Sequence, residues 1–176
     1  MIFSYKGKEP RVGKGTYVSD TARIIGDVII GENCYIGHGA IIRADYGKVE
    51  IGSGTAVQEG AIISSPLENI CIIEDFVTIA YGAVVHSKAI GKHSVVGIGA
   101  ILGIDSRIGE WTIVAEGAVV RMRQIVPNNM VVGGNPAHTI REATPKDHEN
   151  WLKVKELYND LAENYLKGAM KPMPRT

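Results

Sequence analysis

The chain has few leucines and few aromatic residues for its length. Its 176 residues include 6 Leu, against 23 Ile and 17 Val, and aromatic residues make up 6%. Because Leu is ordinarily among the commonest residues, this deficit excludes a helical bundle for most of the chain. The β-branched residues that stand in its place favour strands, so an all-β fold is predicted.

Cysteine, net charge and long apolar runs are also scarce. The two cysteines, Cys34 and Cys71, stand at unrelated positions, which predicts neither a disulfide framework nor a CxxC metal clip. Lys+Arg and Asp+Glu both number 19, so the basic surplus that attracts nucleic acid or an anionic membrane is missing. The opening MIFSYKGKEP lacks the apolar core of a signal peptide, and no apolar run approaches a membrane span. We therefore expect a soluble, cytoplasmic protein with no nucleic-acid and no membrane partner.

An aliphatic residue recurs every six positions through most of the sequence. Twenty positions carry Ile, Val or Leu, and sixteen of the nineteen gaps between them equal six. The other three gaps correspond to insertions of three and four residues and to one deletion. The twenty positions are Val12, Val18, Ile24, Ile30, Ile36, Ile42, Ile51, Val57, Ile63, Ile73, Ile79, Val85, Ile90, Val96, Leu102, Ile108, Val114, Val120, Val126 and Val132.

A second column of small residues follows the aliphatic column at an offset of four. We expect both columns to point inward; the small residues are Thr16, Ala22, Cys34, Ala40, Thr55, Ala61, Ala83, Ala89, Ser94, Ala100, Ser106, Thr112 and Ala118. Residues that tolerate tight corners lie between the columns, among them Gly15, Asp27, Asn33, Gly39, Gly54, Gly60, Gly82, Gly99, Asp105 and Gly117. Each hexad therefore predicts a short strand followed by a corner.

Three hexads make one 18-residue triangular coil, and stacked coils form a parallel β-helix. The repeat resembles the bacterial transferase hexapeptide superfamily, and this resemblance implies a left-handed coil. About six to seven coils fit in residues 12–137. The predicted fold is all-β: a single-stranded left-handed parallel β-helix with a C-terminal α-helix.

The last forty residues have a different composition from the rest. They contain four of the six Leu and one of the 21 Gly, so we expect a β-helix domain over residues 1–140 and a helix with a tail over 141–176. Thr144 is a suitable N-cap, Pro145 suits the first helical position and Asp147 suits a capping box. Gly168 and Pro172 are expected to end the helix. Apolar residues at helical spacing should pack on the β-helix or on a neighbouring subunit; they are Trp151, Val154, Tyr158, Leu161 and Tyr165.

Polar side chains fall into two outward columns because every third hexad lies on the same face, about 4.8 Å further along the stack. One column holds Arg43, Ser64 and His86. The other holds His38, Glu59 and Tyr81, with Gln58 beside Glu59. Both insertions, 46–50 and 66–72, fall in the same part of the chain. Irregular loops on a rigid scaffold commonly carry function, so a site is predicted here.

The segments IIRADYGKVEIGSGTAVQEGAIISS and IEDFVTIAYGAVVHSKAIG resemble the γ-class carbonic anhydrase branch of the superfamily. The later GGNPAHTIRE and the helix resemble its subset around the carnitine-operon and phenylacetate-degradation proteins. This resemblance implies a homotrimer with sites between adjacent subunits. It also implies zinc held by three His, two from one subunit and one from its neighbour.

The motif carries over in part. Arg43 and Asp45 match the family's Arg-x-Asp and are expected at the trimer interface. Gln58 matches the family's Gln, whereas Glu59 replaces an Asp that is one methylene shorter. These matches favour a site of the family's general shape, with Gln58 in a catalytic role and Glu59 binding substrate.

The zinc ligands are where the sequence departs from the family. Ser64 and Tyr81 occupy two of the three His positions, and His86 is the one matching ligand. A catalytic zinc needs three good protein donors; Ser is a poor donor, and a Tyr phenol must lose a proton with a pKa of about 10. We therefore expect no metal and no cofactor, although Cys71 or His93 could rebuild a zinc site.

Three functions remain open at this point. In the first, a small acyl thioester such as a CoA thioester is transferred or hydrolysed at the intersubunit cleft. There His86 is the general base, Gln58 and Tyr81 assist catalysis, and Ser64 and Glu59 bind substrate. The second is a non-catalytic trimeric scaffold or ligand-binding protein. The third is a zinc-dependent carbonic anhydrase with unusual ligands.

Overall fold

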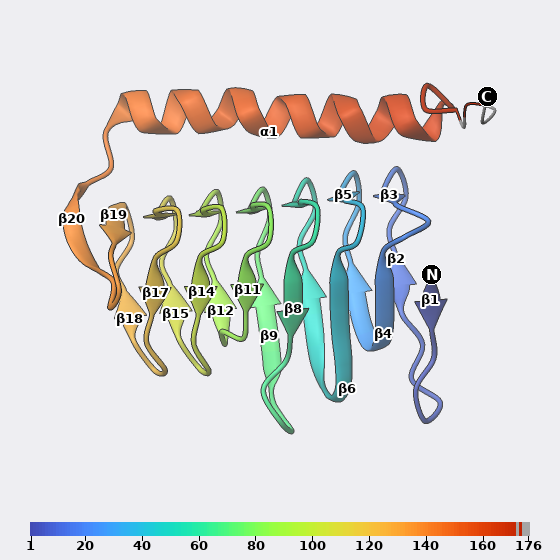
Figure 1. Cartoon of the computed structure of the whole chain (residues 1–176), viewed down its shortest axis with the longest axis horizontal. Helices are drawn as coiled ribbons and strands as arrows, with labels where there is room; N and C mark the ends of the chain where they lie inside the picture. The colour runs from blue at the N-terminus through green and yellow to red at the C-terminus, as the bar shows by residue number, and fades with distance from the viewer. Residues whose placement is uncertain (172, 174–176) are drawn as a thin grey trace.

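The chain forms a stack of triangular coils with one long helix beside it (Figure 1). The computed structural model describes residues 1–171 and 173. We call the face next to the helix the first face. It is an eight-stranded sheet in which the antiparallel strand β20 (His138–Glu142) follows seven parallel strands, so the stack has seven levels. Those seven are β3 (Tyr17–Val18), β5 (Tyr35–Ile36), β7 (Ala56–Val57), β10 (Thr78–Ile79), β13 (Val95–Val96), β16 (Ile113–Val114) and β19 (Met130–Gly133).

The other two faces belong to one 12-stranded sheet, because β4 (Arg23–Ile30) and β6 (Ile41–Ile51) run around the corner between them. The second face continues from the start of β6 through β8 (Ile62–Ser64), β11 (Val84–Val85), β14 (Ile101–Leu102) and β17 (Val119–Val120). The third face continues from the end of β6 through β9 (Ile70–Ile73), β12 (Ala89–Ile90), β15 (Arg107–Ile108) and β18 (Ile125–Val126). β1 (Ile2–Phe3) and β2 (Arg11–Val12) pair with β4.

The aliphatic ladder forms the core, as predicted. Eighteen of its twenty residues are buried, Val18 packs partly against them, and Val12 is 37% exposed because its strand lies at the open end of the stack. One inward assignment was wrong. Ala89 pairs with outward-facing Arg107, and Ser87 is buried instead, because the deletion after Val85 breaks the four-residue offset.

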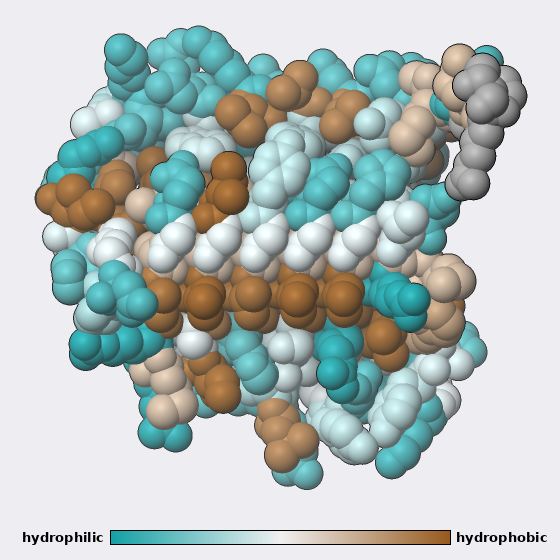
Figure 2. Space-filling view, viewed as in Figure 1, coloured by the Kyte–Doolittle hydropathy of each residue, from teal (hydrophilic) through white to brown (hydrophobic). Residues whose placement is uncertain are grey.

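The second face carries an exposed apolar row, visible along the stack in Figure 2. The strand register aligns one aliphatic residue from each of five successive coils, and Arg23 precedes them. We call this row the apolar stripe; it consists of Ile41, Ile62, Val84, Ile101 and Val119. Three of its members are about two-fifths exposed in the single chain, which is unusual for side chains of this kind that follow one another without interruption.

One corner of the stack holds large aromatic rings, whereas residues that tolerate tight corners, such as Gly, Asn and Asp, were expected at the corners. Phe76, His93 and Trp111 adopt left-handed backbone angles, with φ of 56°, 59° and 55°. Their rings stack with centroids 5.1 and 4.1 Å apart, and His148 of the helix lies 4.4 Å beyond Trp111. Stacking offsets the cost of the left-handed backbone at each residue.

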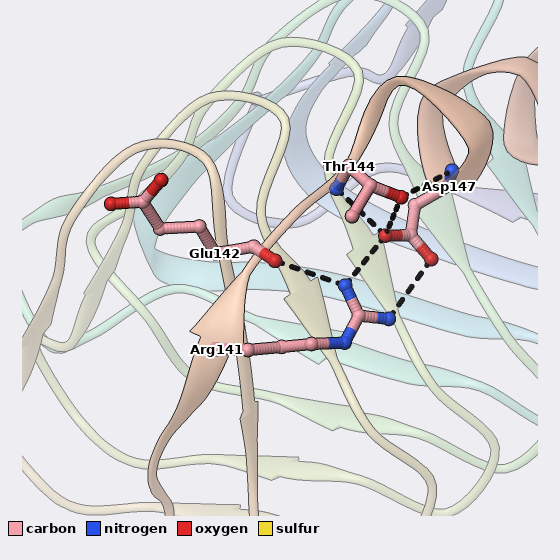
Figure 3. A network of polar contacts seen from close by, with 4 residues as sticks. All are labelled: Arg141, Glu142, Thr144 and Asp147. Atoms are coloured by element: carbon pink, nitrogen blue, oxygen red, sulfur yellow. Dashed lines mark hydrogen bonds and ion pairs between the residues drawn. The ribbon is translucent and has the colours of Figure 1, made fainter.

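The helix α1 (Pro145–Leu166) begins as predicted. The Thr144 side chain accepts from the Asp147 N–H at 3.2 Å, and Asp147 accepts from the Thr144 N–H at 2.7 Å, which completes a capping box. Arg141 of β20 donates two further hydrogen bonds to the Asp147 carboxylate (Figure 3) and lowers its pKa. The cap therefore ties the helix to the last strand of the stack.

The helix runs back along the first face and contacts β3, β5 and β7 (Figure 1). Tyrosines from both partners form a second cluster there, in which Tyr35 and Tyr158 are buried. Gly168 follows the helix with φ of 80°, as expected for its end, and Pro172 lies outside the described residues. No helix in the described part of the chain combines the length and apolarity needed to cross a membrane.

Lys155 is a charged residue buried between α1 and the first face. It is 3% exposed, and its Nζ donates to Thr78 Oγ1 at 3.1 Å and to the Ser94 carbonyl at 3.5 Å. Both partners are neutral, so burial lowers the pKa of the ammonium to about 7. Because the unfolded chain then binds more protons than the folded chain above that pH, the fold gains stability as the pH rises from about 7 toward 10.

We expect Lys155→Met to increase the free energy of unfolding at pH 7 by about 1 to 3 kcal/mol, since it removes a buried charge and keeps an unbranched side chain. The gain over the wild type should shrink as the pH rises to 9. Urea denaturation at several pH values measures it, and the difference between the two proteins cancels the ionisation of other groups. Lys153→Met, on the exposed side of the same helix, is the control; an equal gain there would contradict the prediction.

Candidate functional site

The column of Arg43, Ser64 and His86 borders a cavity of about 260 Å³ where the second face turns into the third. Register places Arg43 directly beside Ser64, and His86 follows Val85 one coil further along. Both insertions contribute to the wall. Tyr46 lies where the register between β4 and β6 shifts, and Leu67 lies in the loop between β8 and β9. The complete lining is Arg43, Asp45, Tyr46, Ser64, Ser65, Leu67 and His86.

His86 is held in one tautomer. Its Nε2 lies 3.1 Å from the carbonyl oxygen of Ser65, and because a carbonyl can only accept, Nε2 carries the hydrogen. In the neutral form of the ring, this arrangement leaves the lone pair of Nδ1 for another partner. A histidine whose second nitrogen is oriented by a backbone carbonyl has the arrangement of a general base.

Arg43 and Asp45 form an ion pair within the chain. Arg43 Nε donates to Asp45 Oδ2 at 3.0 Å, and its Nη2 contacts the same oxygen. The Asp45 carboxylate is mostly buried whereas the guanidinium is half exposed. The pair therefore presents the remaining guanidinium N–H groups at the wall of the cavity.

The second column lies at the corner between the first and second faces. Glu59 Oε1 accepts from the Tyr35 hydroxyl at 2.5 Å, and the Tyr81 hydroxyl lies 2.6 Å from that of Tyr158 in α1. Burial and the neighbouring Glu59 raise the pKa of Tyr35. Burial and the Tyr81 hydrogen bond likewise raise the pKa of Tyr158, so both phenols stay protonated at neutral pH.

Two other residues belong to this corner. Gln58 is 4% exposed, and the backbone N–H of the residue donates to Ile79 O at 2.8 Å. His38 Nδ1 lies 2.7 Å from Ser19 Oγ, which fixes the imidazole at the first level of the column. The polar groups of this corner are therefore fixed by hydrogen bonds to residues of the first face and of α1.

Within one chain, the predicted site residues fall into two groups. The apolar stripe lies between them: four residues separate Glu59 from Ser64, and four separate Tyr81 from His86, and each set of four includes one stripe residue, Ile62 or Val84. Arg43, Ser64 and His86 share one cavity, together with Asp45. Gln58, Glu59 and Tyr81 lie along the opposite edge of the stripe, so neither edge alone holds all the predicted residues.

Three residues of the site were not predicted from the sequence: Tyr46, Leu67 and Tyr158. Tyr46 and Leu67 wall the cavity; they lie in the two insertions, which signalled irregular loops but not the direction of these side chains. Tyr158 belongs to the helical apolar spacing, and nothing in that spacing indicated that its hydroxyl meets Tyr81. Each missed contact joins segments whose relative placement is set by loops.

The zinc implied by the resemblance does not fit the side chains of a single chain. Among residues 1–171 and 173, no group of three or more His, Cys, Asp and Glu side chains is arranged to hold a metal ion. At the cavity, His86 offers one imidazole whose Nε2 is already hydrogen-bonded, and the Ser64 hydroxyl is a weak zinc ligand. Cys71 is buried on the third face, where burial raises the pKa of its thiol to about 12.

Known proteins with similar sequences and structures place the chain in a family. The model of the bacterial transferase hexapeptide (six repeats) matches residues 9–44. A carbonic anhydrase from Geobacillus kaustophilus is 32% identical over 94% of this chain and 91% of its own length. The carnitine operon protein CaiE of a Proteus species is 31% identical over 99% of this chain and 89% of its own.

A solved structure agrees with these relatives. The putative acetyltransferase from Bacillus cereus superposes with a TM-score of 0.91 at 30% identity, covering 94% of this chain and 96% of its own. The predicted left-handed parallel β-helix with its C-terminal helix is thereby confirmed. The chain belongs to the hexapeptide-repeat family, in the branch that contains the γ carbonic anhydrases and the carnitine operon proteins CaiE.

Proposed function

We propose that the protein acts on a small acyl thioester, by transfer or hydrolysis, in clefts between the three copies of a homotrimer. The observation that carries this proposal is His86, whose Nδ1 makes no hydrogen bond within residues 1–171 and 173, beside Ser64 and the Arg43 guanidinium in a cavity of about 260 Å³. This volume lies below the usual range for drug-sized ligands, which favours a short acyl group. The similarity to a putative acetyltransferase at 30% identity supports acyl chemistry.

The trimer is supported by the apolar stripe and by its two polar edges. Copies related by rotation about an axis parallel to the stack keep their coil levels matched, and each copy then offers different edges to its two neighbours. Tyr81 of one copy would face His86 of the next, and Glu59 would face Ser64. Burying the stripe would bring together the two groups of residues that one chain keeps apart, with Arg43 and Asp45 at the interface.

In the proposed hydrolysis, the oxygen of a water molecule attacks the thioester carbon while His86 Nδ1 takes its proton. The hydroxyl of Tyr81 and the amide of Gln58 donate hydrogen bonds to the developing oxyanion. The C–S bond then breaks, and His86 returns the proton to the departing thiolate. Ser64 and Glu59 orient the acyl group; in transfer, an alcohol or amine takes the place of water.

A panel of short acyl-CoA thioesters, incubated with the purified protein and with water, amine or alcohol acceptors, tests the activity. Release of free thiol from at least one of them is expected. Absence of turnover across the panel would overturn the proposal in favour of a trimeric scaffold.

A second candidate, zinc-dependent carbonic anhydrase activity, is favoured by one observation: the 32% identical relative from Geobacillus kaustophilus carries that name. Metal analysis of the purified protein separates the two candidates. Near-stoichiometric zinc together with CO₂ hydration would favour carbonic anhydrase, with ligands beyond His86 drawn from neighbouring copies.

The proposed assembly predicts the effect of a charge in the apolar stripe. Val84→Glu places a carboxylate in the middle of the row, where burial against a neighbouring copy would strip it of water. We expect the mass measured by light scattering to fall from three times 19.0 kDa to 19.0 kDa. Ile125→Glu, at a more exposed isoleucine on the third face, should leave the mass unchanged. A trimer that survives Val84→Glu would show that the stripe is not the interface.

A further inference from the structure

The hydroxyl of Tyr81 is held by the C-terminal helix. Its oxygen lies 2.6 Å from the Tyr158 hydroxyl, yet the Tyr81 side chain is largely exposed, with 44% of the residue accessible. Tyr158 itself is buried between α1 and the first face. Tyr81 therefore has one part open to the edge of the apolar stripe and its reactive atom in contact with a buried phenol.

The direction of this hydrogen bond follows from the surroundings of Tyr158. Its ring lies 5.2 Å from that of Tyr35, and burial raises its pKa, with Tyr81 and the Glu59 carboxylate contributing. In the described part of the chain, the Tyr81 oxygen is the one hydrogen-bond partner of the buried Tyr158 hydroxyl, whereas Tyr81 is exposed and can reach other partners. Because a buried donor without an acceptor is costly, Tyr158 donates to the Tyr81 oxygen. A phenol that accepts a hydrogen bond becomes a stronger donor, and its own O–H is left to point away from the helix.

The helix is fixed on both sides of Tyr158. One turn earlier, Lys155 Nζ donates to Thr78 Oγ1, and Thr78 precedes Tyr81 in the same coil. One turn later, Ala162 is 1% exposed against the first face. These contacts hold α1 in register with the coil that carries Tyr81, which keeps the two hydroxyls within hydrogen-bond distance.

We propose that Tyr158 is a positioning residue of the candidate site, and that the C-terminal helix thereby belongs to the catalytic unit. Its hydroxyl donates to Tyr81 and aims the Tyr81 O–H at the oxyanion of the substrate. This role rests on the proposed function, in which Tyr81 donates to the thioester carbonyl oxygen. Because Tyr81 faces the next copy in the proposed trimer, the helix of one copy would tune the site completed by its neighbour.

The test removes one oxygen atom. Tyr158→Phe keeps the ring contact with Tyr35 and deletes the hydroxyl, and Tyr165→Phe is the matched control. Tyr165 lies two turns further along the same face of α1, and its ring centroid is 5.0 Å from that of Tyr17. In the described part of the chain its hydroxyl makes no hydrogen bond to Tyr81. Tyr81→Phe completes the set and assigns the signal described next.

Two readouts are needed. With 3-fluorotyrosine incorporated, the ¹⁹F signal lost in Tyr81→Phe identifies Tyr81; Tyr158→Phe should move this signal, and Tyr165→Phe should leave it in place. For the thioester that the wild type turns over, Tyr158→Phe should lower kcat about tenfold with KM within about twofold, less than the 10²-fold or greater loss typical of deleting an oxyanion donor itself.

The outcomes distinguish the two proposals. An unmoved Tyr81 signal, or equal kcat losses in Tyr158→Phe and Tyr165→Phe, would overturn the positioning role, because the helix would then act through packing alone. A moved signal and a reduced kcat confined to Tyr158→Phe would support it. If the wild type turns over no thioester, the proposed function fails, and the ¹⁹F signal alone decides whether Tyr158 holds Tyr81.

Discussion

His86→Ala is expected to lower kcat for thioester turnover by about 10²- to 10⁴-fold, the usual contribution of a general base. The Ser65 carbonyl holds Nε2–H of the ring at 3.1 Å, so Nδ1 is the nitrogen that accepts the proton of the attacking nucleophile. Alanine removes that acceptor and leaves the cavity wall otherwise intact. KM should change much less than kcat, because Ser64 and Glu59, the residues proposed to bind the substrate, are unchanged.

The control for this prediction is His138→Ala, which removes an exposed histidine of β20 at the far end of the stack. Steady-state kinetics and the melting temperature should be measured for both variants. Equal turnover in His86→Ala and the wild type would remove His86 from the mechanism. A loss shared with His138→Ala would point to a general effect on the fold rather than on the reaction.

The fold could be predicted because the repeat satisfies one constraint many times. Each hexad needs a large aliphatic residue inside and a residue that tolerates a tight corner, and nearly every coil supplies both. The exceptions come from interactions between coils. Phe76, His93 and Trp111 occupy left-handed corners because their rings stack, and a pattern read within single hexads contains no signal for contacts 17 or 18 residues apart.

The candidate site was predictable in part for the same reason. Register alone placed Arg43, Ser64 and His86 on one line, and the structure gives them a common cavity. The tautomer of His86 depends on the path of the loop after Ser64, and the Tyr81–Tyr158 contact depends on how α1 docks. Loops and helix docking follow no six-residue period, so these features had to come from the structure.

Ser64→His combined with Tyr81→His is expected to create a zinc site. The family resemblance places a His at both positions, and with His86 they would supply three imidazoles, the donor set of a catalytic zinc with one open position. His86 and the residue at 64 lie on one edge of the apolar stripe, whereas the residue at 81 lies on the other. In the proposed trimer the site would form between copies, and His86 would have to release the Ser65 carbonyl for Nε2 to bind the ion.

We expect the double variant to bind Zn²⁺ at least about 100-fold more tightly than the wild type, since metal affinity rises steeply with the number of good donors. Competition with a chromophoric chelator measures the affinity, and bound metal per chain should approach one. Each single variant supplies only two imidazoles and should bind weakly, and adding His86→Ala to the double variant should abolish the gain. If the double variant binds no better than the wild type while remaining trimeric, the two edges do not meet across the interface. Because the same meeting of edges places Tyr81 beside His86 in the proposed reaction, this measurement tests the geometry of the thioester site without requiring its substrate to be known.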